Sequence, residues 1–132
     1  MSFLLDTHTL LWSLFEPGRL GKKATECIQN PDTTVSVSVV SFWEISLKYS
    51  LGKLQLSNVS PEDLPSIVRQ SGIDVLPVTD IHAATFHHLP RMEHKDPFDR
   101  MIIWQAISGK RILISHDSAF SDYHKLGLKV IW

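Results

Sequence analysis

The chain has 132 residues, 43% hydrophobic and 20% charged, and a formal net charge of −1. This composition is ordinary for a globular protein, and the near-neutral charge excludes a long-range attraction to polyanions. Its single cysteine, Cys27, excludes an internal disulfide framework and favours a reducing cytoplasm. No apolar run approaches the roughly 20 residues that a membrane helix needs. We therefore expect one cytoplasmic domain over residues 1–132.

The first half of the chain alternates short apolar runs with helical patterns. We predict a strand over residues 3–5, a helix that Pro17-Gly18 ends, and a second helix over about 21–29. The β-branched residues Val35, Val37, Val39 and Val40, with Ser36 and Ser38 between them, predict the next strand. An S-x-x-E pattern from Ser41 to Glu44 then predicts a capping box, opening a helix that closes at Gly52.

The second half continues the alternation. A helix starting at Ser60 and stopping at Gly72 precedes a strand over residues 73–78 and a helix capped by Thr79-Asp80. Asp96 fits the N-cap of a helix over residues 97–108, which Gly109 ends. The remaining chain predicts a strand over 112–115, a short helix or irregular link over 120–128, and a last strand over 129–132.

Strands that alternate with helices predict an α/β fold, a three-layer α/β/α sandwich around a mostly parallel sheet of about five strands. All strands of such a sheet end at one edge, where ligands bind. Asp6 follows the first strand, Glu44 opens the helix after the second, and Asp117 follows the fourth. Asp99 begins the helix that returns antiparallel to the fourth strand. We expect these four acids to meet at this edge.

Four neighbouring carboxylates favour a bound cation. Two unit charges about 4 Å apart repel by about 4 kcal/mol at an effective dielectric of 20. Oxygen ligands favour Mg²⁺ or Mn²⁺, and such an ion supports hydrolysis of a phosphodiester. Each acid also has a simpler interpretation as a helix cap or turn residue, so the inference depends on all four gathering together.

Several neighbouring residues are candidates for a supporting role. Arg100 is either a phosphate or acid partner near the metal or an i,i+4 partner of Asp96, and Asp96 itself is interpreted as a cap beside the site. His8, His94 and His116 flank the acids but lack the spacing of metal-ligand pairs. We expect these histidines to lie outside the ligand set.

Five motifs, in this order along nearly the whole chain, resemble those of the PIN-domain ribonuclease toxins of the VapC type. They are Leu4-Leu5-Asp6-Thr7-His8, Ser41-x-Trp43-Glu44-Ile45, Leu51-Gly52-Lys53-Leu54, Asp96-Pro97-Phe98-Asp99-Arg100 and Ser115-x-Asp117-x-x-Phe120. The resemblance implies the sheet order 3-2-1-4-5, which places the first and fourth strands side by side.

The same resemblance implies a function. It implies an Mg²⁺- or Mn²⁺-dependent endoribonuclease, the toxin of a type II toxin–antitoxin pair, which cleaves RNA, is inhibited by a cognate antitoxin protein and forms a homodimer. Asp6, Glu44, Asp99 and Asp117 match the family's acidic quartet by position, and Ser115 matches a position that commonly carries a hydroxyl. Relatives often carry paired histidines just before Asp96, whereas this chain has only His94.

Two other functional classes stay open at this stage. A receiver-like signalling domain would accept phosphate on an Asp at the end of the third strand, where only Asp80 is available, and would need a Lys near the last strand, where Lys129 is poorly placed. A catalytically inactive protein-binding module would instead use the helix from Trp43 to Leu54 as its partner surface.

Overall fold

The computed structural model describes residues 1–132 and contains one sheet of five parallel strands. The strands are β1 (Ser2–Leu5), β2 (Thr34–Ser38), β3 (Asp74–Leu76), β4 (Ile112–Ile114) and β5 (Lys129–Ile131). Their order is β3-β2-β1-β4-β5, so β1 lies in the centre and pairs directly with β4. The α/β class and the sheet order are therefore confirmed.

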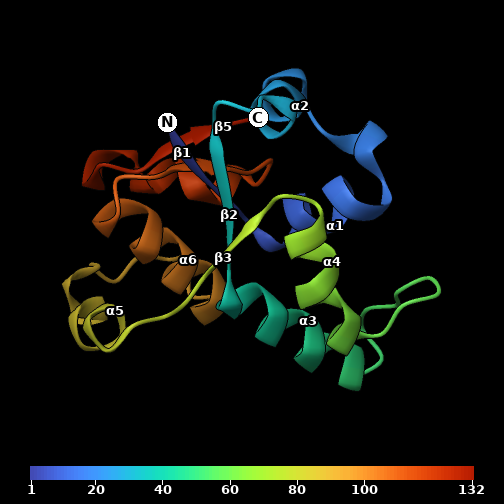
Figure 1. The fold of residues 1–132 in the computed structure, drawn as a ribbon. Coiled ribbons are helices and arrows are strands. Elements are labelled where there is room, and N and C mark those ends of the chain that lie inside the picture. Colours follow the sequence, from blue (N-terminus) through green and yellow to red (C-terminus); the bar gives the residue numbers. More distant parts are fainter.

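Helices cover both faces of the sheet (Figure 1). They are α1 (Thr7–Phe15), α2 (Lys22–Gln29), α3 (Val39–Ser50), α4 (Leu64–Gln70), α5 (Asp80–Thr85) and α6 (Pro97–Ser108). Short 3₁₀ segments span Pro17–Arg19, Pro61–Asp63, Phe86–His88 and Ser118–Leu126. None of these helices combines the length and the apolar character needed to cross a membrane.

Successive residues of the central strand pack into different cores, because side chains alternate across a sheet. Phe3 and Leu5 belong to the cluster that also holds core residues of α1, α2 and α4, whereas Leu4 joins the cluster of α6 and the segment Ser118–Leu126. Both faces of β1 are thus buried, as expected for the middle strand of a parallel sheet. This packing fixes the position of the residue that follows β1.

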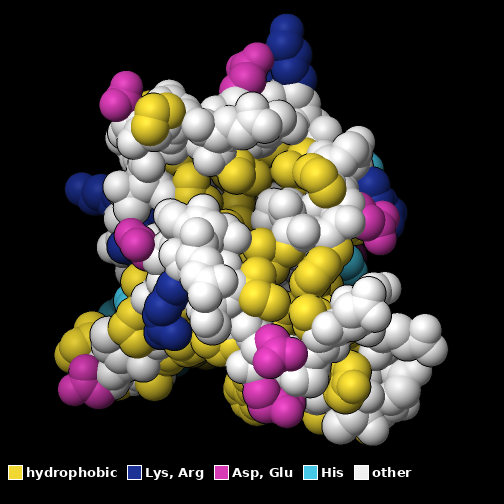
Figure 2. Space-filling model, turned by 45° about the vertical axis from the view of Figure 1, so that its right-hand side comes forward, with side chains coloured by type: hydrophobic (Ala, Val, Ile, Leu, Met, Phe, Trp, Pro, Cys, Tyr) yellow, Lys and Arg dark blue, Asp and Glu magenta, His cyan; other side chains and the backbone are white.

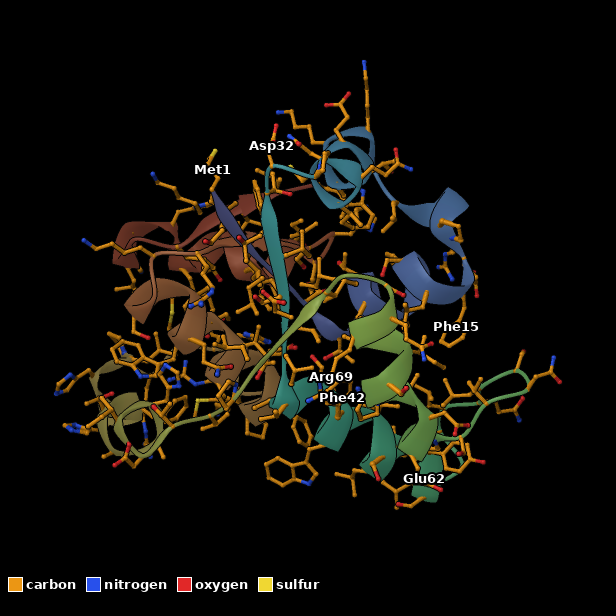
Figure 3. All side chains as sticks on the ribbon, in the orientation of Figure 1. Met1, Phe15, Asp32, Phe42, Glu62 and Arg69 are labelled. Carbon is orange, nitrogen blue, oxygen red and sulfur yellow. The ribbon has the colours of Figure 1, made fainter.

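The two ends of the strands lie at opposite edges of the sheet. Met1 and Asp32 mark the edge at which β1 and β2 begin, at the top of Figure 3. Phe42 lies toward the other edge, where α3 begins (Figure 3). The candidate site lies at this second edge, which we call the carboxyl edge.

The beginning of α3 differs from the sequence prediction. The strand was expected to run to residue 40, but β2 ends at Ser38, whose Oγ accepts a hydrogen bond from the Val40 amide at 3.1 Å and caps α3. Ser41 and Glu44 consequently lie inside the helix, and the predicted capping box between them is wrong. Capping by a buried serine outweighs the strand preference of two β-branched residues. Glu44 therefore has no capping role.

Candidate metal centre at the carboxyl edge

Asp6 directly follows β1 and is buried, with 5% of its surface exposed. Its Oδ1 accepts a hydrogen bond from the Thr9 amide at 2.8 Å and thereby caps α1. Its Oδ2 accepts one from the Ser115 hydroxyl at 2.5 Å. Burial raises the pKa of this carboxyl, although both hydrogen bonds oppose the shift. The cap role and a position in the site therefore coexist in one side chain.

Ser115 connects the ends of β1 and β4. Its Oγ donates to Asp6 and accepts a hydrogen bond from the Asp117 amide at 3.0 Å. The Asp117 Oδ1 accepts from the Ala119 amide at 2.9 Å and caps the following 3₁₀ segment. Asp6 and Asp117 are thus held at neighbouring strand ends by one hydroxyl.

Glu44 lies in α3 with only 3% of its surface exposed, and both of its carboxylate oxygens have partners. Oε1 accepts a hydrogen bond from the Thr7 hydroxyl at 2.6 Å, and Oε2 forms an ion pair with Lys48 one turn further along the helix. The Thr7 hydroxyl also contacts the Ser41 hydroxyl at 2.9 Å. Glu44 is therefore linked to the start of α1 through Thr7, and the Lys48 ammonium group on the same helix offsets its negative charge.

Asp99 lies in the first turn of α6, where Asp96 caps the helix by accepting a hydrogen bond from the Asp99 amide at 3.0 Å. Burial, followed by the charges of Asp96 and Glu44, raises the pKa of the Asp99 carboxyl to about 7. His94 opposes this shift, since its Nε2 lies 3.1 Å from the Asp99 Oδ2. This chain thus keeps a carboxyl in a site that disfavours its negative charge.

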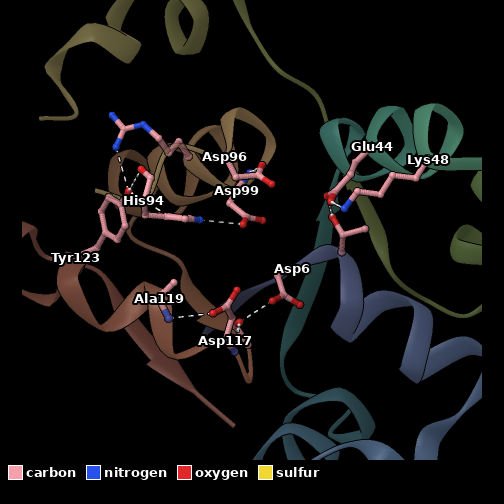
Figure 4. Close-up of polar contacts among 12 residues, drawn as sticks. Asp6, Glu44, Lys48, His94, Asp96, Asp99, Asp117, Ala119 and Tyr123 are labelled. Atoms are coloured by element: carbon pink, nitrogen blue, oxygen red, sulfur yellow. Dashed lines mark hydrogen bonds and ion pairs between the residues drawn. The ribbon is translucent and has the colours of Figure 1, made fainter. Parts of the chain in front are cut away.

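The four predicted acids lie at the carboxyl edge, on segments that come together there (Figure 4). Asp6 and Asp117 lie on one side, Asp99 lies above them, and Glu44 is turned toward Lys48 (Figure 4). No three acidic, imidazole or thiol side chains are close enough together to hold a metal ion as they stand. The chemistry of this carboxylate set fits a hard divalent cation. The assignment of these acids as metal ligands stays a prediction.

The histidines beside the acids occupy two environments. His94 lies between Asp99 and the Tyr123 hydroxyl, which is 3.3 Å from its Nδ1. His8 and His116 are exposed and line a hollow together with Asp6 and Asp117. His94 therefore contacts an acid directly, whereas the other two face solvent.

Arg100 does not form the predicted pair with Asp96, and its role as a phosphate partner stays a prediction. Its guanidinium donates hydrogen bonds to the Tyr123 hydroxyl at 3.0 Å and to the carbonyls of Leu89 and Pro90 at 3.2 and 3.1 Å. It forms no ion pair with Asp96, and only 8% of its surface is exposed. Arg100 is one position after Asp99 on the helix and so points away from the acids, into the core between α6 and the segment before it.

Two residues of the site have partners that the sequence prediction did not name. Thr7 was quoted only as part of a motif, yet its hydroxyl binds Glu44. Lys48 could have been assigned from its spacing, because a Lys four residues after a Glu forms an ion pair on a helix.

Asp63 and Asp80 help to define the limits of the site. Asp63 has the same capping character as the site acids, but it accepts hydrogen bonds from the Ser60 amide and hydroxyl and is exposed. Asp80 follows the edge strand β3 and is exposed, while Lys129 begins β5 at the opposite edge of the sheet. The arrangement that a receiver-like domain needs is therefore missing.

Comparisons with known proteins agree with the fold and the motifs. Ribonuclease VapC22 of Mycobacterium tuberculosis is 28% identical over 129 residues, covering 98% of this chain and 97% of that protein. VapBC2 from Rickettsia felis, solved bound to a DNA fragment from the promoter, has a TM-score of 0.67 and 13% identity, with 99% of this chain and 98% of that chain covered. VapBC-1 from nontypeable Haemophilus influenzae gives a TM-score of 0.65 and 16% identity, covering 99% of this chain and 97% of that one.

The two structural likenesses establish the fold, and the sequence likeness confirms the predicted resemblance to VapC-type proteins. The sequence model of the PIN domain family matches residues 3–126, which is nearly the whole chain. This chain therefore belongs to the PIN-domain family.

Proposed function

We propose that this protein is a metal-dependent endoribonuclease and the toxin of a type II toxin–antitoxin module. The observation that carries the proposal is the gathering of Asp6, Glu44, Asp99 and Asp117 at one edge of the sheet. Similarity to Ribonuclease VapC22 over nearly the full chain supports RNA as the substrate. We further propose that the protein acts in the cytoplasm, where the free thiol of Cys27 stays reduced.

In this proposal Asp6, Asp99 and Asp117 hold an Mg²⁺ or Mn²⁺ ion, and Glu44 completes the acidic set. The bound ion supplies polarisation of a phosphoryl oxygen and activation of water for hydrolysis. Ser115 holds Asp6 and Asp117 at adjacent strand ends, and His94 orients the Asp99 carboxylate. These residues are positioned before substrate arrives, which limits the reorganisation needed for the reaction.

We also propose a cognate antitoxin and a second copy of the chain as partners. The structural relatives include VapBC toxin–antitoxin complexes. Hydrophobic side chains gather in the middle of one face, with charged groups at its margins (Figure 2). Helix α3 and its C-cap expose further apolar groups, among them Trp43, with 65% of its surface exposed, and Leu51, with 58%. Such surfaces are typical of protein interfaces.

The function is tested directly with purified protein and single-stranded RNA. We expect cleavage in the presence of Mg²⁺ or Mn²⁺ and no cleavage after a chelator is added. Restoring the ion should restore cleavage. Cleavage that continues at the same rate in excess chelator would show that the proposed metal chemistry is wrong.

Replacing Ser115 by Ala should weaken Mn²⁺ binding by about 10- to 100-fold, the usual cost of losing a group that orients a metal ligand. The hydroxyl is the group that joins Asp6 to the Asp117 amide. Isothermal titration calorimetry measures the affinity. Ser115→Thr keeps the hydroxyl and should retain most of it, so equal affinities of the Ala and Thr variants would contradict the role of Ser115.

The metal-free protein should lose stability as the pH rises from about 4 to about 7. The Asp99 carboxyl has a pKa of about 7 in the folded chain, against the ordinary aspartate value of 3.8, so the folded chain binds its proton more tightly than the unfolded chain does. The resulting stabilisation is complete below the lower pKa and is lost as pH passes through the higher one. Urea denaturation in chelator across this range measures the effect.

A divalent cation competes with the proton bound to the Asp99 carboxyl, so Mn²⁺ affinity should rise with pH and level off above about 7. Asp99→Asn should flatten the stability profile of the metal-free chain in this range. A wild-type profile without any decline between pH 4 and 7 would contradict the environment assigned to Asp99.

A further inference from the structure

A small hollow lies directly beside the acids. It has a volume of about 220 Å³ and is lined by Asp6, His8, Trp12, His116 and Asp117. Two of the proposed metal ligands therefore form part of its wall, and three aromatic rings form the rest. Its position makes it continuous with the candidate metal centre.

Two of these three rings, those of Trp12 and His116, pack against a fourth ring, that of Trp132. The Trp12 ring centroid is 5.9 Å from that of His8 and 6.4 Å from that of His116. Trp132 lies behind them, with its centroid 5.6 Å from Trp12 and 5.0 Å from His116, whose plane is tilted by 30°. His8 and Trp12 are one turn apart on α1, so their side chains share a helix face.

Neighbouring residues hold the two tryptophan rings in place. Trp132 packs against the hydrophobic core and touches Gly21 so closely that a Cβ there would lie 2.7 Å from it. The Arg19 guanidinium covers Trp12 at 4.4 Å from the ring centroid. His8 and His116, in contrast, are exposed and line the hollow. The two histidine rings therefore face solvent, while the tryptophan rings next to them are held by packing.

We propose that this hollow binds one nucleobase of single-stranded RNA, stacked against His116 and Trp12, so that the adjoining phosphodiester lies at the carboxylates. The inference rests on the proposed ribonuclease function and assigns a substrate subsite to it. Aromatic side chains bind unpaired bases by stacking, with little dependence on sequence.

The size and charge of the hollow favour a base over other ligands. Its volume is below the 300–1,000 Å³ typical of pockets for drug-sized molecules, so it suits a single ring system. Without a cation, the carboxylates of Asp6 and Asp117 repel a free phosphate in the hollow, whereas a neutral base meets no such repulsion. The phosphodiester itself is then placed one nucleotide linkage away.

The test compares His116→Leu with His116→Phe. Leucine fills similar space without a planar ring, whereas phenylalanine keeps the ring. The probe is a single-stranded RNA hexamer carrying one 2-aminopurine, whose emission falls on stacking, and binding is measured in chelator so that the probe stays intact. We expect wild type and His116→Phe to quench the probe with similar affinity, and His116→Leu to bind about tenfold more weakly, as for the loss of one stacking ring.

A matched control is His88→Leu. His88 is also exposed and faces a tryptophan, Trp104, at 6.2 Å between centroids, but it belongs to the segment Phe86–His88 and does not line the hollow. This variant should bind like wild type. A hexamer with an abasic residue at that position, used as an unlabelled competitor of the 2-aminopurine probe, should bind the two His116 variants with equal affinity. Mn²⁺ affinity and circular dichroism should be unchanged in His116→Leu.

The outcomes separate this inference from the proposed function. Suppose that wild type cleaves RNA and that His116→Leu binds the probe with wild-type affinity and cleaves with the KM of wild type. The proposed base subsite is then wrong, and the proposed nuclease activity stands. If the variants differ in binding as expected but wild type never cleaves RNA, the subsite stands and the proposed function fails. Absence of probe quenching by wild type would overturn the subsite.

Discussion

Replacing Asp99 by Asn should abolish RNA cleavage and, at the same time, make the metal-free fold more stable. Asn cannot supply the negative charge that a divalent cation needs, so the loss of activity should exceed about 100-fold, more than the loss of a supporting residue costs. Stability should rise by on the order of 2 kcal/mol at pH 8, after allowance for solvent screening of this partly exposed group, because burial and the charges of Asp96 and Glu44 disfavour the ionised carboxylate. Chemical denaturation in chelator measures the gain.

The two readouts together exclude a trivial explanation, since a variant that is more stable has not lost activity by unfolding. Asp63→Asn is the matched control. It removes a carboxylate that also lies near the start of a helix but outside the site, and it should leave cleavage unchanged. If Asp99→Asn retained cleavage near the wild-type rate, Asp99 could not be a ligand of the catalytic ion.

Replacing Arg100 by Met should destabilise the fold by about 2–4 kcal/mol without a direct effect on metal binding. The substitution removes the donor for three oxygens, those of Tyr123, Leu89 and Pro90. These oxygens lose their donor in a buried region, since only 8% of the surface of Arg100 is exposed. Urea denaturation measures the loss of stability, and calorimetry with Mn²⁺ measures the affinity at a temperature where the variant is folded.

Arg69→Met is the corresponding control, because Arg69 is an exposed residue of α4 and should change stability by less than about 0.5 kcal/mol. A large loss of Mn²⁺ or RNA affinity in folded Arg100→Met, with stability near that of wild type, would contradict the structural role. It would support the role as a phosphate partner that the sequence indicated.

Local sequence patterns predicted the elements well. The helix at residues 97–108 was placed correctly from Asp96 as N-cap, Pro97 in the first turn and Gly109 at its end, and the structure has these residues in those positions. Capping and stop residues act within one turn of the backbone, so their effect can be read from neighbouring residues. The alternation of elements also predicted the α/β class correctly.

The order of the strands could not be derived from such patterns and came from the family resemblance. The hydrogen bond between Ser115 and Asp6 joins residues 109 positions apart, and no local property of either indicates the other. The same limit explains why the sequence did not predict the partners of Arg100, which come from a separate segment and from the link after β4. The error at Ser41 has a different origin, because two serines three residues apart were both suitable caps.

The pairing of Lys48 with Glu44 bears on the charge balance of the carboxyl edge. An ammonium group one helical turn away offsets one negative charge of the acidic set within the chain itself, and the Thr7 hydroxyl satisfies the other oxygen. A cation bound at this edge would then have to balance the charges of Asp6, Asp99 and Asp117 rather than those of all four acids.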